Sequence, residues 1–134
     1  MFGAYQRSEL RIEVDASSQA IARSLTQSNS LKQWLWPQQI VFASPREQAY
    51  LKPGQVFKTE LGVASITHSV ELVEASGLRL LLSGSVDGFH EWQWGEGWVQ
   101  SRLEGVSLLP LNLGNSASLF RLRRYLESAD VLAS

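Results

Sequence analysis

Residues 78–94, LRLLLSGSVDGFHEWQW, alternate apolar and polar side chains on both sides of the turn signal Val86-Asp87-Gly88. Alternation with a period of two residues is typical of two antiparallel strands that each bury one face. A two-residue turn at Asp87-Gly88 would put the tryptophans of the second strand on the face opposite to Leu80 and Leu82. A change of one residue in loop length turns every side chain of a strand to the other face.

A three-residue loop, with Gly88 in the left-handed region, forms a bulge and pairs Leu82 with Trp92 and Leu80 with Trp94. Burying two large aromatic side chains stabilises a protein by more than the expected difference between two loop types. We therefore predict this second register, which gives a buried face rich in tryptophan. The side chains left outside are Ser83, Ser85, Glu91 and Gln93.

Four further segments alternate in the same way and predict strands at residues 10–14, 40–43, 56–63 and 66–72. Alternate residues of a strand share one face. The side chains predicted to point inward are Leu10, Ile12, Val14, Phe57, Thr59, Leu61, Val63, Ile66, His68, Val70 and Leu72.

A last strand follows the turn at residues 95–97. The length of that turn determines which side chains of the strand point inward. A two-residue turn points Val99, Ser101 and Leu103 inward. A three-residue turn points inward Trp98, Gln100 and Arg102. We favour the first because its inward set is more apolar, and the placement of Trp98 and Arg102 stays open.

Apolar residues at helical spacing predict helices near both ends of the chain. Residues 18–28 follow the candidate N-caps Asp15 and Ser17, and a second helix over residues 30–35 must end near Trp36, because Pro37 disfavours helical geometry in the residue before it. A final helix, capped by Asn115 or Ser116, carries the stripe Leu119, Leu122, Leu126 and Ala129. This stripe must cover the concave face of an antiparallel sheet, which predicts an α+β fold with an apolar pocket between two layers.

Composition limits the class of protein. The length of 134 residues fits a single domain, residues 1–134. A net charge of −1 lacks the basic excess that nucleic-acid binding needs, so we predict no nucleic-acid partner. The absence of cysteine excludes disulfides and thiolate-bound metals and fits a cytoplasmic protein. The apolar runs are too short to span a bilayer, so we expect no stable membrane insertion.

The order of predicted elements is one strand, two short helices, six strands and a long helix. Five segments of the sequence accompany this order of elements: residues 10–22, LKQWLWP at 31–37, LKPG at 51–54, GFHEWQW at 88–94 and the closing helix at 119–126. This layout resembles the helix-grip fold of the START and Bet v 1-like superfamily, also called SRPBCC, and most closely its polyketide cyclase/dehydrase-like branch. The resemblance implies a curved sheet around the C-terminal helix and a cavity between them. Members use that cavity for lipids, hormones, polyketides or flavonoids, and a few catalyse cyclisation or dehydration.

Candidate site residues follow from the predicted inward faces. His68 could anchor a ligand by a hydrogen bond or act as an acid or base near neutral pH. His90 has the strand parity of Trp92, and it either approaches the cavity or lies at its solvent rim. No residue spacing typical of a metal site occurs, so we expect no metal and no cofactor. The predicted apolar walls are Phe57, Val70, Leu80, Leu82, Trp92, Trp94, Leu119 and Leu122.

Three functions fit these predictions. The first is a module that binds a hydrophobic small molecule, with His68 as the polar anchor. The second is a metal-free enzyme of the cyclase or dehydratase type with His68 as general base. The third is a protein-interaction domain like the chaperone-activator branch, and a homodimer contact could use the same surface. That surface would be a patch of Trp98, Leu108, Leu109 and Leu111, while Glu91, Glu96 and Glu104 are expected outside the cavity.

Overall fold

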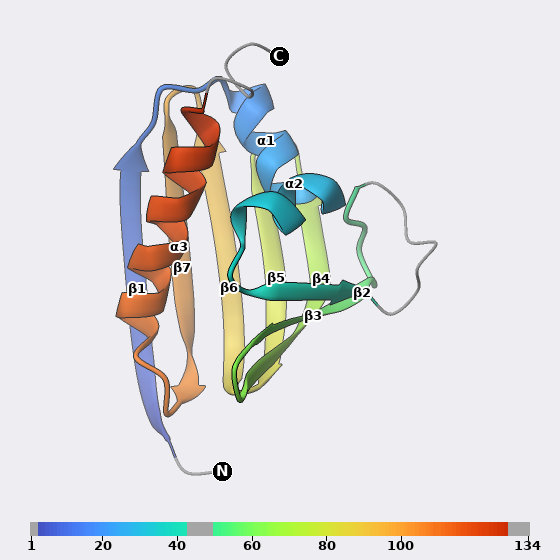
Figure 1. The fold of residues 1–134 in the computed structure, drawn as a ribbon, viewed down its shortest axis with the longest axis vertical. Helices are drawn as coiled ribbons and strands as arrows, with labels where there is room; N and C mark the ends of the chain where they lie inside the picture. Colours follow the sequence, from blue (N-terminus) through green and yellow to red (C-terminus); the bar gives the residue numbers. More distant parts are fainter. Residues whose placement is uncertain (1–2, 43–49, 129–134) are drawn as a thin grey trace.

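The computed structural model describes residues 3–42 and 50–128 (Figure 1). The elements in chain order are β1 (Ala4–Glu13), α1 (Ser18–Thr26), α2 (Ser28–Trp34), β2 (Gln39–Phe42), β3 (Val56–Leu61), β4 (Ala64–Glu74), β5 (Gly77–Gly84), β6 (Val86–Gly95), β7 (Trp98–Ser107) and α3 (Leu111–Leu126). The strands form one antiparallel sheet in the order β1-β7-β6-β5-β4-β3-β2. The predicted α+β arrangement, with two short helices after the first strand and a long helix at the end, is confirmed.

The described helices cover one face of the sheet, and the core lies between the two layers. Figure 1 shows α3 running beside β1 and β7, with α1 and α2 over the other strands. α3 contacts β1 and β7, α1 contacts β6, and α2 contacts β2 and α3. Ile21, Val99 and Leu122 are fully covered in this layer. None of the described helices is long and apolar enough to cross a bilayer.

The face assignment of β5 and β6 was right, but their predicted register was wrong. Leu78 lies opposite Trp92 and Leu80 opposite His90, instead of Leu82 opposite Trp92 and Leu80 opposite Trp94. The offset is an even number of residues, so Leu80, Leu82, Trp92 and Trp94 are still buried on one face. The chain reverses next to Gly84, whose φ of 94° supplies the left-handed conformation that the prediction gave to Gly88.

Gly88 has a different role, because it lies within β6 directly opposite Gly105 of β7. A Cβ atom added at Gly88 would lie 1.9 Å from the backbone oxygen of Glu104 and 2.5 Å from the Cα atom of Gly105. The two strands therefore approach each other more closely than any side chain at Gly88 would permit.

The inward faces of β3 and β4 are shorter than predicted. Phe57, Thr59, His68 and Val70 are buried as expected. Leu61 and Val63 are exposed because β3 ends at Leu61 and the chain turns at Gly62, which has a φ of 60°. Leu72 is exposed because the β4–β5 pairing shifts between Val70 and Leu72.

The turn between β6 and β7 has the favoured two-residue form, since Gly95 pairs with Trp98. Val99 and Ser101 are consequently buried, and Arg102 lies on the outer face.

The final helix begins four residues before its predicted cap. Pro110 precedes its first residue, and the side chain of Gln6 on β1 accepts a hydrogen bond of 3.0 Å from the backbone N–H of Leu111. This contact satisfies a helix N–H group without any residue of the helix itself. Leu119, Leu122 and Leu126 are buried as predicted, while Ala129 and the strand residue Ala43 lie outside the described residues.

We expect Gly88→Ala to lower the free energy of unfolding by about 2–3 kcal/mol, because the atoms that its methyl group meets belong to the backbone and cannot rotate away. Gly114→Ala in α3 is the matched control. Its methyl group would meet no atom within 4 Å, and it should stabilise the fold by about 0.5–1 kcal/mol through helix propensity. Urea unfolding of the full chain measures both variants, and a wild-type midpoint for Gly88→Ala would contradict the account.

Candidate functional site

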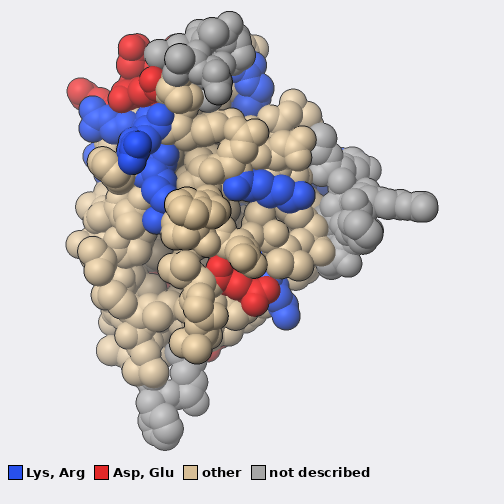
Figure 2. Space-filling model, viewed as in Figure 1, with Lys and Arg blue, Asp and Glu red and all other residues tan. Residues whose placement is uncertain are grey.

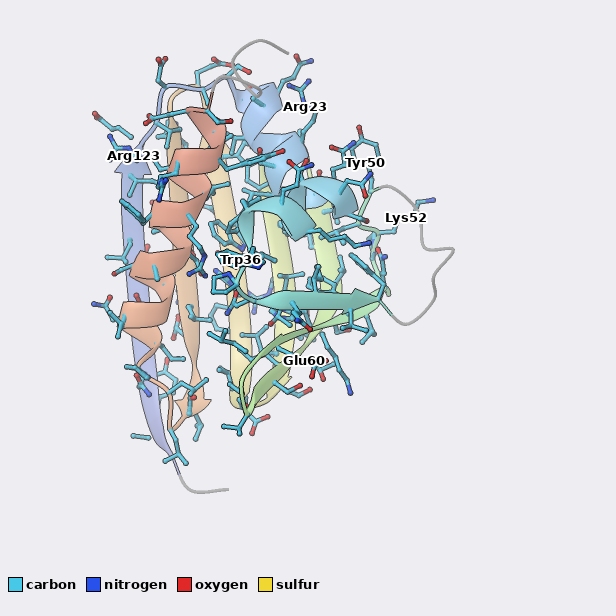
Figure 3. All side chains as sticks on the ribbon, in the orientation of Figure 1. Arg23, Trp36, Tyr50, Lys52, Glu60 and Arg123 are labelled. Atoms are coloured by element: carbon cyan, nitrogen blue, oxygen red, sulfur yellow. The ribbon has the colours of Figure 1, made fainter. Side chains whose placement is uncertain are left out.

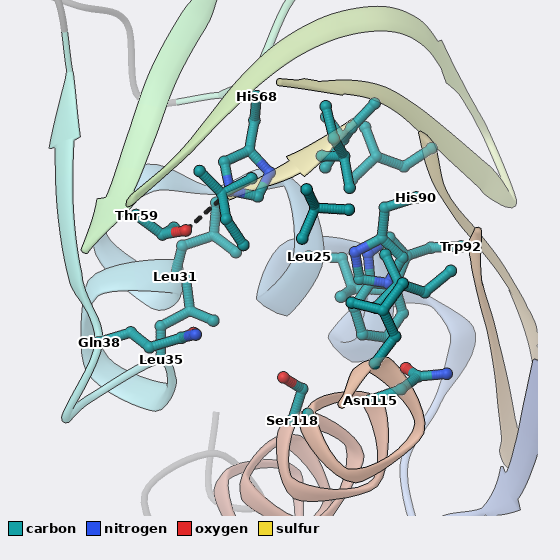
Figure 4. Close-up of a pocket in the computed structure, with 18 of the residues that line it drawn as sticks. Leu25, Leu31, Leu35, Gln38, Thr59, His68, His90, Trp92, Asn115 and Ser118 are labelled. Carbon is teal, nitrogen blue, oxygen red and sulfur yellow. Dashed lines mark hydrogen bonds between the residues drawn. The ribbon is translucent and has the colours of Figure 1, made fainter. Parts of the chain in front are cut away.

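A cavity of about 160 Å³ lies between the sheet and the helices (Figure 4). Leu25 of α1 and Leu31 of α2 form one side, and Leu80 and Leu82 of β5 form the opposite side. The first turns of α3 close it with Leu111, Gly114, Asn115 and Ser118. Since α3 begins at Leu111, its N-terminal half covers the cavity.

The structure brings together five of the predicted wall and anchor residues. Phe57, His68, Leu80, Leu82 and Trp92 line the cavity. The other four are buried in the core and do not line it: Val70, Trp94, Leu119 and Leu122. For Leu119 and Leu122 the reason is the early start of α3, which places them beyond the part of the helix that faces the cavity. Ligand contact by any of the nine residues stays a prediction.

His68 is placed on the inner wall by the alternation of β4 (Figure 4). Its Nε2 atom lies 2.8 Å from the hydroxyl oxygen of Thr59, and its ring stacks on Phe57 with a centroid distance of 4.7 Å and an interplanar angle of 6°. Its Nδ1 atom is buried and has no hydrogen-bond partner among the described residues. Burial lowers the pKa of His68 to about 4, so the ring is neutral at pH 7.

His90 also lines the cavity, two strands away from His68 on the same face of the sheet. Its Nε2 atom lies 2.7 Å from the hydroxyl oxygen of Ser101 on β7. The Ser101 hydroxyl donates to Oδ1 of Asn115 at 2.7 Å, and Nδ2 of Asn115 donates to Ser8 on β1 at 3.1 Å. Burial, followed by the nearby His68, lowers the pKa of His90 to about 3. The inward option for His90 is therefore the one observed.

Aromatic contacts hold the wall around His90 in place. The His90 ring lies 4.6 Å from Trp92, and Trp92 meets the edge of Trp34 at 6.2 Å with an interplanar angle of 82°. Trp34 donates its indole N–H to the backbone oxygen of Ser24 at 2.7 Å. These rings have specific partners, which favours a fixed cavity wall over a mobile one.

Sequence reasoning did not assign Gln38, Asn115 and Ser118 to the site. Gln38 and Ser118 are half-buried at the cavity wall, and Asn115 is fully buried. The sequence indicates Asn115 or Ser116 as a helix cap, and a residue four positions inside a helix gives no pattern that separates a buried asparagine from an exposed one. Gln38 follows Trp36, which is 74% exposed on the connection between α2 and β2 (Figure 3).

Glu91, Glu96 and Glu104 do not line the cavity, as expected. Glu91 pairs with Arg79 at 3.0 Å on the outer face, and Glu96 accepts hydrogen bonds from Ser18 beside the β6–β7 turn. Glu104 lies 2.5 Å from Arg102 and also accepts a hydrogen bond from the Tyr5 hydroxyl, which lowers the pKa of that carboxyl group. No Asp, Glu, Lys or Arg side chain is among the described residues of the cavity wall.

The predicted interaction patch is not formed. Trp98 begins β7 and is covered in part by Arg11, whose guanidinium lies 4.0 Å from the ring centroid. Leu108 follows the other end of β7, about ten residues away, and Leu111 is buried. Figure 2 shows basic side chains beside acidic ones near one end of the helical face, and further basic and acidic side chains near the middle of that face.

The two histidines predict a loss of stability on mild acidification. Both folded pKa values lie below the ordinary value of 6.5, so the unfolded chain takes up protons that the folded chain does not. The two histidines lower the free energy of unfolding little above about pH 6.5, and increasingly as the pH drops toward their folded pKa values. At pH 5 each histidine should lower the free energy of unfolding by about 2 kcal/mol relative to neutral pH.

Urea midpoints measured between pH 7.5 and 5 test this prediction. His90→Phe should reduce the pH dependence by about half, because only His68 then contributes. A midpoint that stays constant over this range in the wild-type chain would show that the rings are not held neutral.

No protein-family model matches the sequence, and no curated protein gives a significant match. Several solved structures match. The Aha1 dimer from Colwellia psychrerythraea has a TM-score of 0.65 at 20% identity, over 91% of this chain and 96% of that chain. CV1439 from Chromobacterium violaceum has a TM-score of 0.70 at 17% identity, over 91% and 97%.

DynU16, a protein in the dynemicin biosynthetic locus, has a TM-score of 0.66 at 18% identity, over 91% of this chain and 47% of that chain. The chain therefore spans about half the length of DynU16. Identities this low show the fold alone. With the strand order and the placement of α3, they show that the chain has a Bet v 1-like helix-grip fold.

Proposed function

We propose that this protein binds a small apolar molecule in the cavity between the sheet and α3. The observation that carries the proposal is the cavity itself, which combines mainly aliphatic and aromatic walls with a few polar groups. Such a combination is typical of small-molecule sites, where apolar burial supplies affinity and polar groups set orientation.

The cavity volume limits the size of the ligand. An apolar cavity of about 150 Å³ holds a benzene-sized guest, whereas drug-sized ligands occupy about 300 Å³ or more. A volume of about 160 Å³ favours a molecule with a single ring or a short branched chain. The lipids and polyketides that the family resemblance implies are larger than this space.

A route to solvent is supported by the residues on the helical side. Gly114 lines the cavity and is itself exposed, and a Cβ atom there would meet no atom within 4 Å. Gln38 and Ser118 are half-buried, so the wall changes from apolar to polar toward this side. A ligand can enter here without unfolding of the sheet.

Binding is supported better than catalysis. A general base works best with a pKa near the working pH, and burial holds His68 well below neutrality. No described carboxylate lies in the cavity that would raise the pKa of His68. His68 is therefore proposed as part of the binding wall, not as a proton acceptor in a reaction.

Blocking the cavity at Gly114 should weaken binding without loss of the fold. Gly114→Leu places a side chain in the open space beside the cavity, and we expect its affinity for toluene to fall at least tenfold. Gly114→Ala is the matched control because it makes the same change in helix propensity with little added volume. Calorimetry or ligand-observed NMR on the full chain measures the affinity.

Wild-type chain that binds neither toluene nor a similar one-ring probe would overturn the proposed function. Equal binding by Gly114→Leu and wild type would instead place the probe outside the cavity. Unfolding midpoints of both variants, expected at or above the wild-type value, show that any loss of binding is not a loss of fold.

A further inference from the structure

The hydrogen bonds behind His90 have a fixed direction. Nδ2 of Asn115 lies 3.2 Å from the backbone oxygen of Ser101, and a carbonyl oxygen can only accept. This contact orients the Asn115 amide, so that its Oδ1 atom accepts the hydroxyl hydrogen of Ser101 at 2.7 Å. The same amide donates to Ser8, whose hydroxyl in turn donates to Asn112 at 2.8 Å.

The direction of this chain determines which nitrogen of His90 carries hydrogen. A serine hydroxyl has one hydrogen, and that of Ser101 is already donated to Asn115. The contact of 2.7 Å between Ser101 and His90 therefore requires Nε2 of His90 to be the donor. In a neutral imidazole the other nitrogen, Nδ1, then has a free lone pair and can only accept.

The Nδ1 atom of His90 is available to the cavity. His90 lines the cavity, and its hydrogen bond to Ser101 is the only one described for its ring. His90 is half-buried at the cavity wall, whereas Nδ1 of His68 is fully covered.

We infer that the ligand is an uncharged one-ring molecule whose hydroxyl group donates a hydrogen bond to Nδ1 of His90. This inference rests on the proposed function and narrows it to one ligand class. A carbonyl or ether oxygen has no hydrogen to donate, so it would meet the lone pair of Nδ1 without forming a hydrogen bond. A charged group would be buried among walls that hold no described charged side chain to pair with it. Ser101 and Asn115 are positioning residues, because they act only through His90.

Three probes of nearly equal size test the inference on the full wild-type chain: phenol, toluene and benzaldehyde. Phenol donates a hydrogen bond, toluene makes none, and benzaldehyde only accepts one. We expect phenol to bind about fivefold to tenfold more tightly than the other two, which is the range of a single net hydrogen bond. In His90→Phe the three affinities should become equal within a factor of two.

Nitrogen-15 NMR of the His90 ring reads the position of the hydrogen directly. The wild-type ring should be the Nε2–H form, and its Nδ1 resonance should shift when phenol binds but not when toluene binds. In Ser101→Ala the two tautomers should both be populated, and the preference for phenol should fall.

The outcomes separate the two proposals. Equal binding of the three probes, or an Nδ1–H ring in the wild-type chain, overturns the inference about the ligand and leaves the cavity proposal intact. If none of the probes binds, both fail. Should Ser101→Ala not fold, the wild-type probe series and the NMR measurement still decide the question.

Discussion

The attachment of α3 to the sheet through Asn115 is the constraint on which the site depends. Asn115 is buried, so its amide needs hydrogen-bond partners within the protein. Ser101 of β7 and Ser8 of β1 provide the partners, while Gln6 of β1 holds the first N–H group of the helix. These contacts fix the helix over the β1–β7 side of the sheet. The space beside its first turns is left as the cavity.

Alternation in the sequence predicted the faces of the strands well, and it could not predict their registers. Trp92 and Leu80 were correctly placed inward because any even shift keeps the same face. The position of the turn depended on which glycine took the left-handed conformation, and Gly84 and Gly88 are equally suitable in sequence. What decides between them is the contact of Gly88 with β7, a tertiary feature that local sequence does not encode.

The same limit applies to the site. Phe57, His68 and Trp92 could be predicted because strand alternation turns them toward the helices. Leu119 and Leu122 were correctly buried, but they were assigned to a cavity wall that the preceding turns of α3 actually form. Pro110 precedes the first residue of α3, and Gln6, which accepts the hydrogen bond from the backbone N–H of Leu111, lies more than 100 positions earlier in the chain. The predicted cap, Asn115 or Ser116, was wrong. Asn115 lies inside α3, where its amide binds the sheet and, through Ser101, orients His90.

A crystal structure determined under xenon pressure tests most directly whether the cavity exists. Xenon enters apolar cavities of this size and has no hydrogen bonds to satisfy, so its position depends only on available space. The account predicts xenon between the β5 side chains Leu80 and Leu82 and the first turns of α3, with little movement of the helix. Repacked side chains that fill this space, with no xenon bound, would contradict it.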